Sequence, residues 1–163
     1  MSRRKPSSKR AWKINLLIHT SNYVFRKQIL KTLAKEILSL LDAGHLPLGM
    51  KEVNIVLTDD EQIKDLNATY RGKNRPTDVL SFCRTESPAL PQPDPLLGEI
   101  VISVETAERQ AHKSRIDLDR ELTRLMIHGI LHLFGYDHEK VPAAKAREMR
   151  RLEDQIMKAT RPL

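Results

Sequence analysis

The chain has 163 residues, of which 30% are charged, with a formal net charge of +7 and a sequence pI of about 9.7. This length suits one domain around one core, and a single cysteine, Cys83, excludes an internal disulfide. No apolar stretch approaches the length of a transmembrane helix, so we expect a cytoplasmic protein with no membrane contact. The basic balance favours a polyanionic partner, most simply nucleic acid.

The first ten residues predict a flexible basic tail. They include Arg3, Arg4, Lys5, Lys9 and Arg10, and no acidic residue precedes Glu36. A start rich in serine, lysine and arginine also fits an organelle transit segment, but a clear strand begins at residue 11. We therefore expect a tail over 1–10 and a single domain over 11–163.

Apolar periodicity predicts the elements of the first half. Alternation predicts half-buried strands, and apolar residues three and four apart predict amphipathic helices. In chain order we expect a strand over 12–18, a helix over 24–41, a strand over 53–57 and a helix from about 59 to 70. The segment 71–78 is polar and basic, contains Pro76, and is expected to be a loop.

The second half predicts two strands and three helices. Strands are expected over 79–84 and 99–104, separated by a proline-rich loop, and Cys83 is expected to be a small buried strand residue. Helices are expected over 105–115 and 118–134, followed by a last helix with Pro142 in its first turn. The whole pattern predicts an α+β fold: one small mixed sheet of about four strands, packed with about five helices.

Three histidines, His128, His132 and His138, form a His-x3-His-x5-His pattern that begins on the helix expected over 118–134. On a helix the first two lie one turn apart on one face, whereas continued helix would place the third about 80° away from the first. Gly135 stands where a left-handed cap would end the helix and let the chain turn back. Three neutral imidazoles suit zinc, and also copper, nickel or iron, and we expect one zinc ion.

Gly129 argues against peptide hydrolysis at this site. Metalloproteases with a similar helix carry a glutamate directly after the first histidine, and that glutamate is the general base. Here that position is Gly129, so the usual proton acceptor is missing. A metallopeptidase-like hydrolase is therefore the weaker interpretation.

Four blocks of sequence carry a resemblance to a known family. They are Asn67-x-x-Tyr70-Arg71-Gly72-Lys73, Pro76-Thr77-Asp78-Val79-Leu80-Ser81-Phe82, Leu97-Gly98-Glu99-Ile100-Val101-Ile102-Ser103 and the segment from His128 to His138. Through them, from about residue 50 to 140, the chain resembles the YbeY-type endoribonucleases, also called ribosomal RNA maturation factors. Two positions depart from the family pattern, since Glu99 stands where Asp is common and Cys83 where Pro is common.

The resemblance implies an activity, a cofactor and partners. It implies a zinc ion on the three histidines and cleavage of single-stranded RNA, in 16S rRNA 3′-end maturation and ribosome quality control. It also implies contact with the small ribosomal subunit and with an associated ribosomal protein or an Era-type GTPase.

Arg71 is the residue that the resemblance singles out beside the metal. A guanidinium group can hold two phosphate oxygens and offset the charge that develops in phosphoryl transfer, so we interpret Arg71 as catalytic. Lys73 and Arg75 are candidates for contacts to the RNA backbone. Asp137 either orients an imidazole or is an exposed turn residue.

Two questions stay open at the level of sequence. A non-catalytic ribosome-assembly factor, stabilised by its metal, can carry the same three ligands, and a fourth protein ligand would favour it. Either water or the RNA 2′-hydroxyl can be the nucleophile. We favour water, because three neutral ligands leave the ion its full positive charge, and that charge lowers the pKa of a bound water.

Overall fold

The computed structural model describes residues 11–41, 46, 49–84 and 95–160. The tail expected over 1–10 and most of the proline-rich loop lie outside the described residues. No helix within the described ranges combines the length and the apolar character needed to span a bilayer.

Four strands form one mixed sheet, as the sequence predicts, and their order in the sheet is β1-β2-β4-β3. Their bounds are β1 Lys13–Ile18, β2 Glu52–Thr58, β3 Val79–Cys83 and β4 Leu96–Ser103. Strands β1, β2 and β4 run parallel, while β3 pairs antiparallel with β4 and forms one edge of the sheet.

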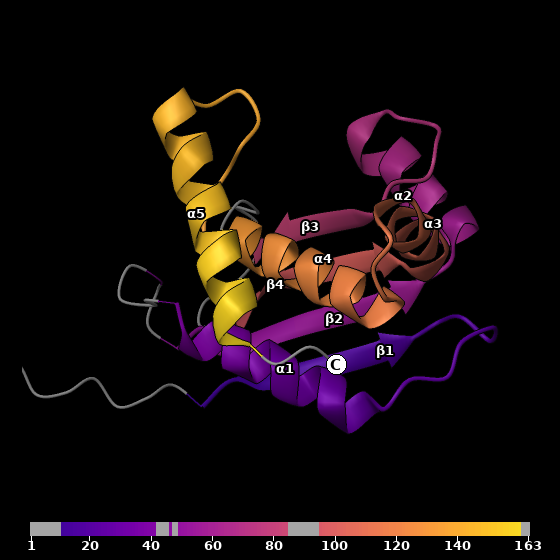
Figure 1. Cartoon of the computed structure of the whole chain (residues 1–163), viewed down its shortest axis with the longest axis horizontal. Helices are drawn as coiled ribbons and strands as arrows, with labels where there is room; N and C mark the ends of the chain where they lie inside the picture. The colour runs from indigo at the N-terminus through magenta and orange to yellow at the C-terminus, as the bar shows by residue number, and fades with distance from the viewer. Residues whose placement is uncertain (1–10, 42–45, 47–48, 85–94, 161–163) are drawn as a thin grey trace, which may run out of the picture.

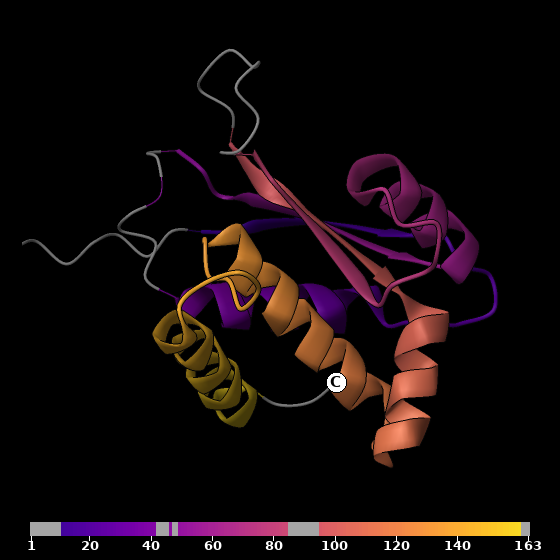
Figure 2. The ribbon, with the colours of Figure 1, turned by 90° about the horizontal axis from the view of Figure 1, so that it is seen from above.

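Five helices surround the sheet in the part of the chain that the structure describes (Figure 1). Their bounds are α1 Lys27–Ser39, α2 Asp60–Arg71, α3 Val104–Ser114, α4 Leu118–Leu133 and α5 Ala143–Ala159. Seen from above, α2 lies alone on one side of the sheet, and the other helices lie on the opposite side (Figure 2). The larger apolar cluster fills that crowded side, and a smaller one around Ile63 and Leu80 lies under α2.

Helix α4 is the central helix of the fold, because it contacts β3, β4, α1, α3 and α5. Its apolar side chains Leu122, Leu125, Met126 and Leu133 are each at most 1% exposed. Burial of a leucine of this kind contributes about 1.5–3 kcal/mol relative to an exposed one, so α4 is anchored independently of any ligand. His128 and His132 therefore lie on a helix whose packing does not depend on a metal ion.

Two element boundaries differ from the expected ones by three residues. Helix α1 begins at Lys27 and not at residue 24, because residues 23–26 are not helical: Tyr23 and Phe25 pack toward the core, while Val24 is fully exposed. Strand β4 begins at Leu96, three residues early, since Gly98 pairs with both Val53 and Cys83. Pairing on both sides overrides the low strand propensity of glycine.

Candidate metal centre

The three histidines converge at the C-terminal end of α4. Gly135 adopts φ +86°, and the N–H groups of Gly135 and Tyr136 donate to the carbonyls of His132 and Leu131 at 3.0 and 3.1 Å. This left-handed closure ends the helix as the sequence predicts, and it turns the following loop back so that His138 faces the other two rings.

The geometry of the histidine cluster fits a single ion. The candidate ligand atoms of His128, His132 and His138 all lie within 4.8 Å of one another, and the Nε2 atoms of His128 and His132 are 3.1 Å apart. Two lone pairs this close need a proton or a cation between them. Nitrogens at the usual zinc distance in a tetrahedral site are about 3.3 Å apart, so this cluster could hold a metal ion.

Glu153 on α5 orients the first histidine, and sequence reasoning missed it. Its Oε1 lies 2.5 Å from Nδ1 of His128. A proton on Nδ1 then donates to the carboxylate, which leaves the Nε2 lone pair facing the other rings. Burial alone would raise the pKa of Glu153, but the hydrogen bond with His128 lowers it overall. Helical spacing is the sequence signal that could have identified Glu153. This residue follows the buried Met149 by four residues and therefore lies on the same face of α5.

Burial keeps His132 neutral. The pKa of this imidazole is lowered to about 4, first by burial and then by the nearby His128 and His138, with a smaller contribution from Arg71. A neutral ring is the form that binds a metal ion, so His132 needs to lose no proton for binding at neutral pH.

Asp137 is a turn residue. Its Oδ1 accepts hydrogen bonds from the backbone N–H groups of Glu139 and His138, at 2.9 and 2.7 Å, and these lower its pKa. Of the two roles that the sequence left open, the hydrogen bonds support the turn, which fixes the backbone beside His138.

Gly129 faces the sheet. A Cβ atom there would lie 2.7 Å from Cγ2 of Ile100 in β4, which is closer than such contacts occur. A glutamate at this position would enter the core and not reach the histidines. The packing of α4 on the sheet therefore gives a physical reason for the missing protease base.

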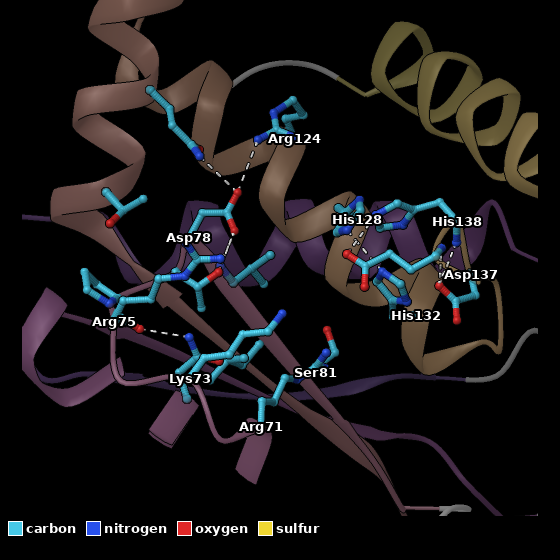
Figure 3. A pocket seen from close by; sticks show the side chains of 18 of the residues that line it. Arg71, Lys73, Arg75, Asp78, Ser81, Arg124, His128, His132, Asp137 and His138 are labelled. Atoms are coloured by element: carbon cyan, nitrogen blue, oxygen red, sulfur yellow. Dashed lines mark hydrogen bonds and ion pairs between the residues drawn. The ribbon is translucent and has the colours of Figure 1, made fainter. Parts of the chain in front are cut away.

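The histidines form one wall of a cleft of about 950 Å³ (Figure 3). The opposite wall comes from the end of α2, the following loop and β3. Five basic side chains line it against three acidic ones: Arg71, Lys73, Arg75, Arg124 and Lys140 against Asp78, Asp137 and Glu139. The cleft is therefore net basic and suits a polyanion.

Arg71 lies in this cleft together with the histidines, as the last residue of α2. Gly72 caps the helix, and the buried Asn67 donates from Nδ2 to the carbonyl of Arg75 at 2.8 Å, which holds the loop against the helix. Lys73 and Arg75 are thereby presented on the same wall as Arg71.

Arg124 is a second cleft residue that sequence reasoning missed. It precedes His128 by one helical turn, a spacing that could have revealed it. Its Nη2 lies 2.6 Å from Oε1 of Glu121 and 3.9 Å from Oδ2 of Asp78, and the Glu121 hydrogen bond raises its pKa. Arg124 therefore carries a positive charge in the cleft, held in place by Glu121 and Asp78.

Cys83 is only partly buried against the core, so the expectation of a fully buried residue is wrong. Its Sγ lies 3.5 Å from the carbonyl of Leu133, yet β3 is an edge strand and leaves part of the side chain open to the cleft.

Comparison with known proteins agrees with the sequence resemblance. A family model described as Endoribonuclease YbeY matches residues 16–161. A relative from Moorella thermoacetica named Endoribonuclease YbeY is 45% identical over 136 residues, covering 80% of this chain and 86% of its own. One of the same name from Aquifex aeolicus is 38% identical over 151 residues, covering 93% and 95%.

A solved structure has the same fold. The solution structure of the protein TM1509 from Thermotoga maritima matches with a TM-score of 0.58 and 29% identity, covering 90% of this chain and 87% of that one. With the family model and the relatives taken together, this chain belongs to the YbeY endoribonuclease family.

Proposed function

We propose that this protein is a zinc-dependent endoribonuclease that cleaves single-stranded RNA in the cleft between α4 and the 71–81 segment. The observation that carries the proposal is the convergence of three imidazoles within 4.8 Å of one another, in the wall of a net basic cleft. The family membership supports the reaction class.

The side chains of this chain have separable roles in the proposal. His128, His132 and His138 are the metal ligands, and Glu153 holds His128 in the tautomer that can bind. A zinc ion bound there would supply a Lewis acid and lower the pKa of a bound water. Arg71 holds non-bridging oxygens of the scissile phosphate and offsets the charge that develops on them. Lys73, Arg75 and Arg124 hold the flanking phosphates.

The ligand set favours catalysis over the assembly-factor alternative. Among the described residues, the group around His128 that could hold a metal comprises three histidines. Three protein ligands are typical of catalytic zinc sites, whereas structural sites have four. The alternative needs a fourth protein ligand to the ion.

Water is the proposed nucleophile, with the scissile phosphate held by Arg71. Under this proposal a 2′-deoxy substitution at the cleaved nucleotide is tolerated, because the 2′-hydroxyl takes no part in the attack. Attack by that hydroxyl would instead require it and leave a 2′,3′-cyclic phosphate end. End-group analysis of the released fragments distinguishes the two.

The proposed biological role is 16S rRNA 3′-end maturation and ribosome quality control in the cytoplasm. The partners would be the small ribosomal subunit and an associated ribosomal protein or Era-type GTPase. Family membership and the net charge of +7 support an rRNA substrate.

The direct test compares the wild-type protein and His132→Ala on a defined RNA in single-stranded and duplex form. The expected result is cleavage of the single strand by wild type alone, with loss of bound metal in the variant. Arg120→Ala, on the exposed part of α4, is the matched control and should cleave as wild type does. Equal cleavage by wild type and His132→Ala would contradict the proposal.

A further inference from the structure

A second groove, of about 600 Å³, lies next to the histidine cleft. Arg71, Ser81 and Cys83 line both hollows. Because β3 is an edge strand, the two hollows meet where the sheet ends, with α4 on one side and α2 on the other. A chain that contacts Arg71 in the cleft can therefore continue into this groove.

Tyr70 is the prominent side chain of the second groove. It lies in the last turn of α2, and 65% of it is exposed, which is unusual for a large aromatic residue. Its ring contacts Phe82 at a centroid separation of 5.1 Å and an interplanar angle of 66°. With so much of the residue exposed, at least one face of the ring is open to a ligand.

The two hollows differ in their aromatic lining. Both have more basic than acidic side chains, but the groove carries the rings of Tyr70 and Phe82 beside the carboxylate of Glu99, whereas no phenylalanine, tyrosine or tryptophan lines the described part of the cleft. Glu99 repels a phosphate but can accept a hydrogen bond from an exocyclic amino group of a base. The groove therefore suits a nucleobase, and the cleft suits the phosphate backbone.

Tyr70 and Arg71 are consecutive residues of a helix, so their side chains diverge by about 100°. This places an aromatic ring and a guanidinium group side by side: Tyr70 lines the groove, and Arg71 lines both the groove and the cleft. A nucleotide presents the same two features, a planar base and a charged phosphate, on either side of its sugar.

We propose that the groove around Tyr70 binds the nucleobase adjacent to the phosphate held by Arg71, with the base stacked on the Tyr70 ring. The inference rests on the proposed endoribonuclease function and adds a base-binding subsite to it. Stacking on an aromatic ring accepts any base, so this contact favours single-stranded over paired RNA without demanding a sequence. Bases with an exocyclic amino group gain the additional acceptor of Glu99.

The first test distinguishes stacking on an aromatic ring from contact with an apolar side chain of any kind. Tyr70→Leu removes the aromatic face but keeps an apolar side chain, and Tyr70→Phe and Tyr70→Trp keep a ring. We expect Tyr70→Leu to lower kcat/KM on a single-stranded RNA by about 5- to 100-fold, the effect of losing one stacked base. Tyr70→Phe and Tyr70→Trp should stay within about threefold of wild type. Val24→Ala, which truncates a fully exposed side chain elsewhere, is the control.

The second test locates the base. A series of RNAs, each with one abasic nucleotide, is cleaved by wild type and by Tyr70→Leu. One position next to the cleavage site should lose rate with wild type, and the same position should show no further loss with Tyr70→Leu. Equal abasic penalties for both proteins, or unchanged kcat/KM for Tyr70→Leu, would overturn the inference.

The outcomes also separate this inference from the function on which it rests. Wild-type protein that cleaves no RNA would remove the proposed function itself. Cleavage by wild type that is insensitive to the ring at position 70 would leave that function in place and remove the base subsite. Metal content and thermal midpoint, measured for each variant, should match wild type, because most of Tyr70 is exposed and it is not among the residues of the larger core cluster.

Discussion

Nδ1 of His128 lies 2.5 Å from Oε1 of Glu153, and this contact joins α4 to α5 across 25 residues of sequence. It fixes both the tautomer and the direction of the ring that begins the histidine cluster. The last helix is therefore part of the candidate metal centre, although none of the three histidines lies on it.

Glu153→Gln should weaken metal binding about 10- to 100-fold, since the amide cannot accept the Nδ1 proton with a full negative charge. A competition titration against a chromophoric chelator measures the affinity. Glu148→Gln, an exposed change on the same helix, should leave it unaltered. If both variants bound metal as wild type does, Glu153 would have no part in the centre.

Arg71→Glu should reduce RNA cleavage by about 100-fold or more and leave metal content unchanged, because the arginine is proposed to meet phosphate and not the ion. Steady-state cleavage and metal analysis on the same preparation provide the two readouts. A parallel loss of bound metal would assign Arg71 a structural role instead.

Removing the metal should loosen residues 128–140 without unfolding the domain. Helix α4 is held by buried Leu122, Leu125 and Leu133, none of which depends on the ion. Hydrogen exchange should increase in that segment alone, with the far-ultraviolet circular dichroism preserved. Loss of most secondary structure on chelation would show that folding requires the metal.

The metal-free protein should lose stability as the pH falls from about 6.5 toward 4. The pKa of His132 is lowered to about 4 in the folded chain, so between these values the unfolded chain binds a proton that the folded chain does not. The contribution of a neutral His132 is complete above pH 6.5 and is lost on acidification. Denaturant titrations should give a shallower pH dependence for His132→Asn, and equal slopes would assign the effect to other groups.

Sequence periodicity located most of the fold because the apolar spacing is local. It failed where contacts with distant residues decide the structure. The late start of α1 follows from the inward packing of Tyr23 and Phe25, and the start of β4 depends on pairing at Gly98. Both are tertiary effects that a single window of sequence does not contain.

The same distinction holds for the candidate site. The three histidines lie within eleven residues, and the turn at Gly135 comes between the second and the third. Their convergence could therefore be predicted from the sequence. Glu153 could not be assigned to His128, since only the packing of α5 on α4 brings them together. Cys83 lies in an apolar stretch of sequence, and the edge position of β3 leaves its side chain only partly buried.

A zinc titration of metal-depleted protein, with RNA cleavage followed at each addition, tests the central claim most directly. Cleavage of a single-stranded RNA should rise in proportion to added zinc and reach its plateau at one ion per chain, and His138→Ala should show no such rise. Full cleavage by rigorously metal-free protein, or a plateau unrelated to the bound zinc, would contradict a histidine metal centre as the site of catalysis.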